Sequence, residues 1–477
     1  GGYCSHFDYY RGDAPFSESE TQAIRDFAIE KQFLLSIAYH SSRSGNVSEK
    51  VIYSWEWGDG TKYSPDFDVI QEIGVKIANL TLKDAVDGST YDPTTSKSMK
   101  GNAHDWFYTE TGCIQYLIEM GTANMQSADS AHVYQIIEDN FNGAFYLFNR
   151  AWGNTNNSSL SADKYQITGH VTDAVTGGVV QANVKILEMD GGMLISRYTD
   201  SFGRYRRLLN EGNYNLNISA EGYESHEQSF YSSESEVTEY DVVLIPSPVH
   251  DLFLDLTVPN GFSGLIALVR QTELNTDYIY IVSGENQFNW HEDNYKLTIV
   301  SEEGLSPSVF EINLTDDMFI SIDLSESEII WEENFDNLDN WVGSVYWYAD
   351  GSLRSQTNLT YSNSIESFLT SSVPIHVEEA TDAVFQLSLQ YELEWDNDTL
   401  SLGLNDISQG QIIWLNHWTD QNWVEHTEYI PAILDPGYYA TVIRLKTDGS
   451  VQYRGLVMES LTLMKSSTVQ LDIIDLA

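Results

Sequence analysis

The sequence predicts a multidomain chain, in which a mixed α/β segment with flanking helices is followed by all-β sandwich domains. The chain has 477 residues, several times the size of one typical domain. Helical and strand patterns alternate as far as Trp152, which is typical of an α/β layer structure. Beyond Trp152 the helical period disappears, and short alternating runs separated by turn residues indicate β-sandwiches.

The α/β segment is expected to span residues 1–152. A helix should start near Ser17, because Ser17 and Glu20 have the spacing of a capping box ahead of apolar residues at helical period. Further along, the apolar patterns predict the strand 33–40, the helix 65–82, the buried strand 113–121 and the long helix 129–152.

The β part begins after a polar Gly/Asn/Ser linker at residues 153–164. Turn residues and alternating runs predict a small sandwich, a second small β-sandwich and a larger jelly-roll-like sandwich rich in tryptophan. The last residues are expected to be a truncated connector. In that order, these segments are 165–247, 248–327, 328–466 and 467–477.

The charge balance limits the partners of the chain. Its 24 basic and 71 acidic residues give a formal net charge of −47, spread along the whole sequence. Such a surface repels phosphates, which argues against nucleic acid and anionic membranes as partners. It suits high ionic strength, where charges are screened over roughly 8 Å or less, so a marine or halophilic source is the modest inference. No run of about 18 apolar residues is present, and no membrane span is predicted.

The residues that could carry chemistry lie in the α/β segment. His40 and Glu119 each close an apolar strand run, Tyr91 lies in a loop, and His104 precedes an Asp-Trp pair. Catalytic groups gather beyond strand ends in such sheets, so His40 and Glu119 could face each other across a site. The alternatives are a hydrogen-bonded structural histidine and a solvated glutamate. No HExxH, GxSxG or phosphate-loop motif is present to decide between them.

The order of these features resembles the zinc metallocarboxypeptidases, the family of carboxypeptidases A and T, over about residues 1–152. The similar stretches are "YYRGDAPFSESETQAIRDF", "LLSIAYHSS", "VIYSWEWGDGTKYSPD" and "YDPTTSKSMKGNAHDWFYTETGCIQYLIEMG". Residues 165–247, with "GHVTDAVTGGVVQANVKI" and "TDSFGRYRRLLNEGNYNLNISAEGY", resemble the carboxypeptidase regulatory-like domain, a transthyretin-type sandwich. The resemblance implies the C-terminal portion of a catalytic domain, followed by its usual neighbour.

The resemblance also implies roles for single residues in the hydrolysis of C-terminal peptide bonds. His40 would be a zinc ligand and Glu119 the general base that takes a proton from zinc-bound water. Tyr91 would close over the substrate on a flexible loop, Ser41 would line the cleft, and His104 would help to form the floor of the side-chain pocket.

The family's first two zinc ligands and its carboxylate-binding arginine cannot be found in this sequence. Because a catalytic zinc normally has three protein ligands, we expect the chain to be a fragment with an incomplete Zn²⁺ site that is inactive alone. The whole protein would be a secreted or cell-surface enzyme acting on peptides. The alternative is a catalytically dead peptidase-like scaffold in a cell-surface binding or adhesion protein.

The β modules leave two questions open. The acidic stretch 331–339 could bind Ca²⁺ in the C-terminal β domain, with a solvated acidic loop as the alternative. The tryptophans of the C-terminal β domain could stack on glycans or protein surfaces, with core packing as the alternative. Those considered are Trp341, Trp347, Trp418 and Trp423.

Overall fold

The computed structural model describes residues 16–41, 48–57, 62–84, 87–96, 102–122, 129–153, 164–189, 197–302, 304–343, 346–355, 360–394, 397–449 and 452–473. The chain divides into two compact units, which are described separately. The first unit comprises residues 1–220 and 225–245, and the second comprises residues 221–224 and 246–477. Within the described ranges, no helix has both the length and the apolar character that crossing a bilayer requires.

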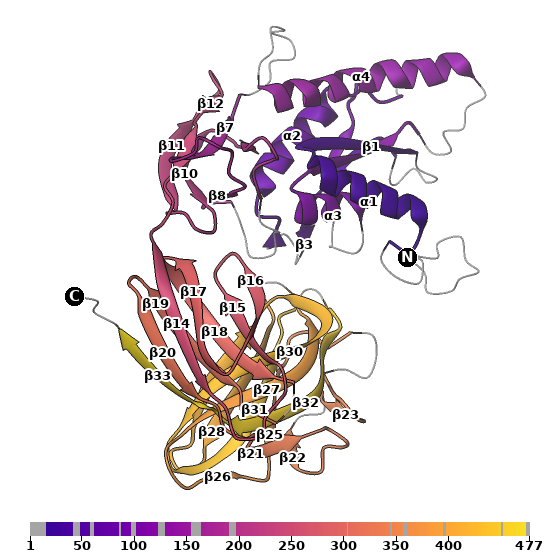
Figure 1. Cartoon of the computed structure of the whole chain (residues 1–477). Helices are drawn as coiled ribbons and strands as arrows, with labels where there is room; N and C mark the ends of the chain where they lie inside the picture. The colour runs from indigo at the N-terminus through magenta and orange to yellow at the C-terminus, as the bar shows by residue number, and fades with distance from the viewer. Residues whose placement is uncertain are drawn as a thin grey trace. The chain divides into compact units, whose positions relative to one another are not determined.

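The α/β segment contains α1 Ser19–Lys31, β1 Leu35–Ser41, β2 Lys50–Tyr53, β3 Glu56–Trp57, β4 Lys62–Tyr63, α2 Phe67–Asn79, β5 Asp92–Thr95, α3 Ala103–Trp106, the π-helical turn η1 Phe107–Thr111, β6 Ile114–Met120 and α4 Ser130–Trp152. Its mixed sheet has the strand order β1-β6-β2-β5. Figure 1 shows β1 of this sheet with α1, α2, α3 and α4 around it. β1 is parallel to β6, β6 is antiparallel to β2, and β2 is parallel to β5. α2 packs on β2 and β5 and against α4, whereas α3 contacts β6.

The predicted helices and strands of this segment form, but the predicted capping box does not. α1 begins at Ser19, near Ser17 as predicted, but Glu18 is at the N-cap position and no side chain makes a capping hydrogen bond. The Ser17 hydroxyl instead donates to the neighbouring Glu18 carboxylate. At α4 the cap does form, because the Asp129 side chain accepts from the Ala131 amide.

The regulatory-like region is a pair of small sheets in the first unit. Its strands are β7 Gln166–Asp173, β8 Asn183–Ile186, β9 Arg204–Leu208, β10 Gly212–Ser219, β11 His226–Ser232, β12 Thr238–Glu239 and β13 Val242–Leu244. One sheet has the order β11-β10-β8, and the other has the order β12-β7-β13 with β9 paired to β7. Buried aliphatic residues fill the space between them, among them Ile167, Val171, Ile186 and Leu216.

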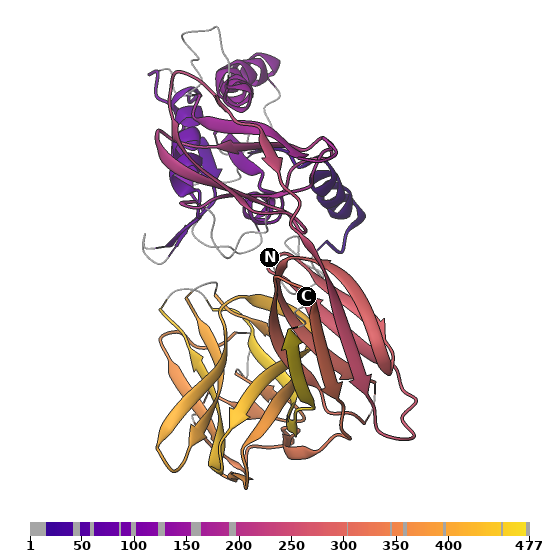
Figure 2. The ribbon, with the colours of Figure 1, turned by 60° about the vertical axis from the view of Figure 1, so that its left-hand side comes forward.

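The second unit begins with a sandwich built from β14 Val249–Thr257, β15 Ile266–Gln271, β16 Thr276–Ile281, β17 Gly284–His291, β18 Asp293–Ser301, β19 Ser308–Leu314 and β20 Met318–Asp323. Its sheets have the orders β17-β14-β20-β33 and β16-β15-β18-β19. The strand β33, Thr468–Ile473, comes from the end of the chain and pairs antiparallel with β20 (Figure 2). The prediction of a connector at 467–477 is therefore wrong, since Val469 packs against the core of this sandwich.

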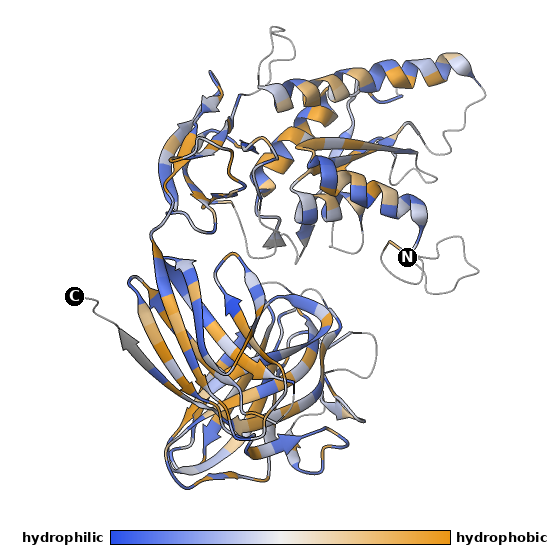
Figure 3. Cartoon of the chain, in the orientation of Figure 1, coloured by the Kyte–Doolittle hydropathy of each residue, from blue (hydrophilic) through white to orange (hydrophobic). Residues whose placement is uncertain are grey.

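The larger sandwich contains β21 Ile329–Glu333, β22 Trp341–Gly343, β23 Tyr348–Ala349, β24 Leu353–Arg354, β25 Glu366–Ser371, β26 Ile375–Val377, β27 Thr381–Glu392, β28 Thr399–Asp406, β29 Gln411–Trp418, β30 Gln421–Leu434, β31 Gly437–Lys446 and β32 Gly455–Lys465. Its sheets have the orders β23-β24-β32-β27-β30 and β22-β25-β31-β28-β29. β21 pairs with β32, and β26 with β31. Figure 3 shows the alternation of apolar and polar residues along these strands that such a two-sheet core requires.

Most of the tryptophans considered as binding residues pack inside this sandwich. Trp341, Trp347 and Trp418 belong to its buried core. Trp423 is half-buried, with the Arg454 guanidinium 4.9 Å from its ring centroid. Core packing is therefore the alternative that holds for three of the four.

Candidate active site

His40 and Glu119 lie side by side at the ends of two parallel strands. They are direct partners in the β1–β6 register. The Nδ1 atom of His40 is 3.0 Å from Oε2 and 3.2 Å from Oε1 of Glu119. The His40 side chain is 65% exposed and that of Glu119 only 9% exposed. The predicted meeting of these two strand ends is confirmed, and it forms a site open to solvent from the histidine side.

The sheet register fixes what surrounds the Glu119 carboxylate. Lys50 on β2 is the register partner of Glu119 on the side away from His40. Directly opposed residues in neighbouring strands project from the same face of a sheet, so His40, Glu119 and Lys50 form one row. A nearly buried carboxylate thus lies between two groups that can carry positive charge. Sequence reasoning missed Lys50, because only the strand register identifies it.

These side chains fit part of a zinc site but not a whole one. A histidine nitrogen is a ligand that Zn²⁺ prefers, and a carboxylate beside the metal is suited to act as a base on a water molecule. A catalytic zinc normally has three protein ligands. Within the described ranges, no group of three metal-binding side chains includes His40 or Glu119. No catalytic step through zinc follows from these residues alone.

Tyr91 makes a buried structural contact, and its role in binding substrate stays a prediction. Its side chain is 2% exposed, and burial raises the pKa of its hydroxyl group. The hydroxyl oxygen accepts a hydrogen bond from the Gly121 amide at 2.9 Å and lies 3.5 Å from Nδ2 of Asn140. Tyr91 therefore fixes the chain just after Glu119, and it is not on a loop open to substrate.

His104 is also buried. Its ring is 3% exposed in α3, and burial lowers the pKa of the imidazole, which favours its neutral form. The His104 carbonyl accepts from the hydroxyl of Ser54, which follows β2 at the end opposite Lys50. Four residues of strand separate Lys50 from Ser54, about 13 Å. The structure does not bring His104 to the His40–Glu119 pair, and a pocket role remains a prediction.

Ser41 is the last residue of β1 and is exposed next to His40. It lies at the rim of the site. Its predicted role in lining the cleft stays a prediction. The neighbouring segments 42–47 and 97–101, which the resemblance connects with the cleft, lie outside the described residues.

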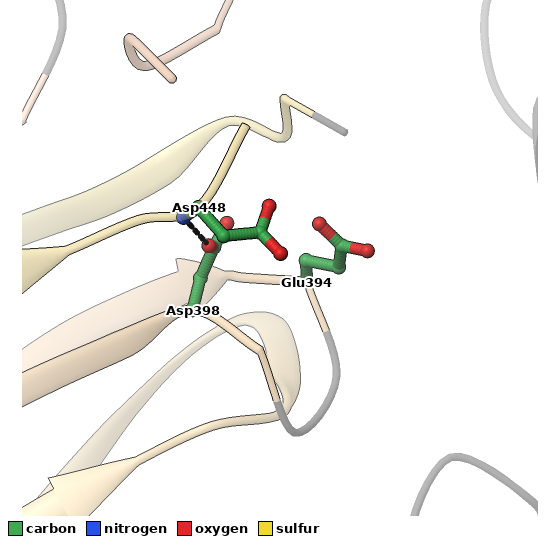
Figure 4. Close-up of side chains that lie close together, drawn as sticks. All are labelled: Glu394, Asp398 and Asp448. Atoms are coloured by element: carbon green, nitrogen blue, oxygen red, sulfur yellow. Dashed lines mark hydrogen bonds between the residues drawn. The ribbon is translucent and has the colours of Figure 1, made fainter. Parts of the chain in front are cut away.

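A second group of potential metal ligands occurs in the larger sandwich, away from the stretch 331–339. Oxygen atoms of Glu394, Asp398 and Asp448 all lie within 4.8 Å of one another (Figure 4). Asp398 accepts hydrogen bonds from the Tyr361 hydroxyl and, at 2.8 Å, from the Asp448 amide. Burial raises the pKa of Asp398 to about 6.

The acidic side chains of the stretch 331–339 either hold the backbone or are exposed to solvent. The Glu333 carboxylate accepts from the Phe335 amide at 2.8 Å and from the Trp341 indole at 2.9 Å, so it holds a turn. Glu332, Asp336 and Asp339 are exposed to solvent. Calcium binding in this stretch stays a prediction.

Comparison with solved structures returns β-sandwich modules at low similarity. A carbohydrate-binding module from Cellvibrio mixtus lichenase 5A, solved with cellotriose, has 9% identity, covers 29% of this chain and 98% of its own, and gives a TM-score of 0.19. A streptococcal ancillary pilin has 11% identity, covers 34% of this chain and 62% of its own, and gives a TM-score of 0.23. The C-terminal module of a marine laminarinase from Zobellia galactanivorans has 10% identity, covers 29% and 93%, and gives 0.17.

Family comparison is more informative for the first unit. No curated protein is a match to the chain. Residues 4–143 match the zinc carboxypeptidase family. Residues 166–245 match the carboxypeptidase regulatory-like domain. The chain therefore contains a zinc carboxypeptidase segment followed by a carboxypeptidase regulatory-like domain.

Proposed function

We propose that this chain is part of a secreted, zinc-dependent metallocarboxypeptidase that hydrolyses C-terminal peptide bonds. The observation that carries the proposal is the contact between Nδ1 of His40 and the Glu119 carboxylate at the ends of β1 and β6. When bound, zinc supplies a Lewis acid that polarises a carbonyl and lowers the pKa of a water molecule. His40 would be one of its ligands. Glu119, held in place by the sheet, accepts the proton of the attacking water and delivers it to the leaving amine.

Two uncovered surfaces support completion of this segment by further polypeptide. In the described sheet, β1 is an edge strand, and it is the strand that carries His40. Large apolar side chains also form an exposed stripe along α4 at the helical period of 3.6 residues. The stripe consists of Tyr134, Ile137, Phe141, Phe145, Phe148 and Trp152. An unpaired strand edge and a contiguous exposed apolar stripe both mark contact sites for further polypeptide.

The location and the β modules are part of the same proposal. An acidic, strongly charged chain with β-sandwich modules behind the peptidase segment suits an extracellular or cell-surface enzyme at high ionic strength. The modules would hold the enzyme on a glycan or protein surface. Peptides with a free C-terminus are the proposed substrates.

The test is metal analysis and hydrolysis of a blocked dipeptide by the full-length protein. Glu119→Gln should keep the fold and lower the turnover number by about 10²–10⁴-fold, the usual contribution of a general base. Glu285→Gln, which removes the same charge from an exposed position on β17 in the second unit, should have no effect. Full activity of Glu119→Gln would exclude the proposal. A full-length protein without zinc or activity would favour the non-catalytic scaffold instead.

The isolated chain provides a second check. With one histidine ligand it should bind no stoichiometric zinc and turn over no substrate. A zinc content near one per chain would show that the site is complete without further polypeptide.

A further inference from the structure

Arg197, in the regulatory-like region, reaches into the zinc carboxypeptidase segment within the first unit. Its Nη2 atom donates to the Tyr108 carbonyl at 2.7 Å, and its Nη1 atom donates to the Thr109 carbonyl at 3.2 Å. Both carbonyls belong to η1, the π-helical turn. The Tyr108 carbonyl also accepts from the Gly112 amide at 3.2 Å, at the end of the turn. A planar guanidinium that binds this carbonyl and the next one therefore fixes the end of η1.

The surroundings of Arg197 are shaped to receive this side chain. Its guanidinium carbon lies 5.6 Å from the centroid of the Tyr108 ring, in the range of a cation–π contact. Gly112 ends η1 with a φ of +74°, and a Cβ atom there would lie 2.5 Å from Nε and 2.6 Å from Cδ of Arg197. Glycine at this position therefore provides both the left-handed turn and the space for the arginine.

Tyr108 passes this contact on to the interior of the peptidase segment. The residue is fully buried, and its hydroxyl oxygen accepts from the Asp66 amide at 3.0 Å, just before α2. Its ring meets that of Trp55 edge-on, with centroids 5.5 Å apart. The turn held by Arg197 leads directly into β6, because the Cys113 amide bonds back to the Phe107 carbonyl at 3.2 Å and β6 starts at Ile114.

Further contacts cross the same boundary. Arg206 donates to the Ala151 carbonyl at the end of α4, and Arg207 lies 3.7 Å from the Asp66 carboxylate. In the other direction, the fully buried Arg150 donates to the Leu209 carbonyl at 2.6 Å. Arginines therefore bind backbone carbonyls from both sides, which is typical of a fixed interface rather than of a flexible tether.

We propose that the carboxypeptidase regulatory-like domain is a structural brace of the peptidase segment, in which Arg197 positions η1 and thereby the start of the strand that carries Glu119. The two domains then form one cooperative folding unit. This role goes beyond the proposed hydrolysis and requires neither zinc nor turnover. Arg197 is a positioning residue, since it acts on Glu119 only through the backbone of η1 and β6.

Hydrogen exchange of the full chain, read by mass spectrometry on peptides covering residues 102–122, tests the brace. Arg197→Ala should accelerate exchange at the Gly112 and Cys113 amides and along β6 by about tenfold or more, because two charge-assisted hydrogen bonds are lost. Arg197→Lys should restore part of the protection, since an ammonium group can bind one carbonyl but not both in the same plane. The matched control is Arg204→Ala, which removes the same charge from an exposed side chain paired with Asp200.

A double-mutant cycle separates the brace from a general loss of stability. Gly112→Ala should accelerate exchange in the wild-type background by displacing Arg197 and straining the turn. In the Arg197→Ala background its effect should be smaller, because only the strain remains. If Arg197→Ala exchanges like Arg204→Ala, or if the two substitutions are additive, the brace does not exist. Should Arg197→Ala fail to fold, Arg197→Lys with and without Gly112→Ala gives the same comparison.

Discussion

Replacing Asp398 with Asn should remove a pH dependence from the stability of the second unit. Asp398 has no exposed surface, and burial raises its pKa to about 6 in the folded state. An unperturbed aspartate has a pKa of about 3.9. The folded state therefore holds a proton that the unfolded chain releases between about pH 4 and pH 6, and this aspartate makes the second unit less stable as the pH rises through that window.

The magnitude follows from the difference between the two pKa values. A gap of about two units, at about 1.4 kcal/mol per unit, gives roughly 2 kcal/mol between pH 4 and pH 7 once partial titration is included. We therefore subtract the free energy of unfolding of Asp398→Asn from that of wild type. This difference should be greater at pH 4 than at pH 7 by about this amount. Urea unfolding followed by tryptophan fluorescence, with a chelator present, measures both proteins at each pH.

A second aspartate in the same sandwich serves as a control of opposite sign. Hydrogen bonds, chiefly from the Ser408 side chain, lower the pKa of Asp406. Asp406 should therefore stabilise the folded state at neutral pH and lose this effect as the pH falls. The free energy of unfolding of Asp406→Asn should accordingly lie closer to that of wild type in acid than at neutral pH. If wild type and Asp398→Asn differ in free energy of unfolding by the same amount at pH 4 and at pH 7, burial does not raise the pKa of Asp398.

Three further changes test other parts of the structure. Tyr91→Phe should cost about 1–3 kcal/mol in urea unfolding by leaving the Gly121 amide without its acceptor; no loss would mean that the hydroxyl is not bonded there. Gly74→Ala should cost about 1–3 kcal/mol, because its Cβ atom would lie 2.5 Å from the Tyr53 ring; unchanged stability would show that α2 can shift freely. Calcium added at pH 7 should raise the unfolding temperature of wild type but not of Asp398→Asn if a cation binds in the larger sandwich, and equal responses would contradict such binding there.

The meeting of His40 and Glu119 could be predicted because short-range patterns place each of them at a strand end. Each residue ends a short apolar run rich in strand-forming residues, and parallel pairing of those runs places their ends at one edge of the sheet. Of the two strands, β6 is largely buried, whereas β1 is half-buried and exposed at its end. The helices followed from their apolar period in the same way. The capping box at the start of α1 does not form, since Ser17 bonds to its neighbour Glu18 rather than to the backbone of the first turn.

The remaining assignments depended on contacts between distant parts of the chain. Nothing local to Tyr91 indicates that its hydroxyl meets the Gly121 amide, so the sequence did not show that this loop residue is buried. The C-terminal strand β33 was missed because its partner β20 lies about 150 residues earlier, a separation that no window along the sequence can cover. The contact of Arg197 could not be predicted from the sequence either, since the carbonyls that it binds belong to another domain.

The central claim is that His40 and Glu119 belong to one zinc centre, and the zinc content of the full-length protein carrying His40→Ala tests it most directly. The control is Ser41→Ala, which changes the neighbouring exposed position at the same strand end. The account predicts that zinc stays near one per molecule in Ser41→Ala and falls far below that in His40→Ala, because a three-ligand site loses one ligand. Full zinc occupancy in His40→Ala would contradict it.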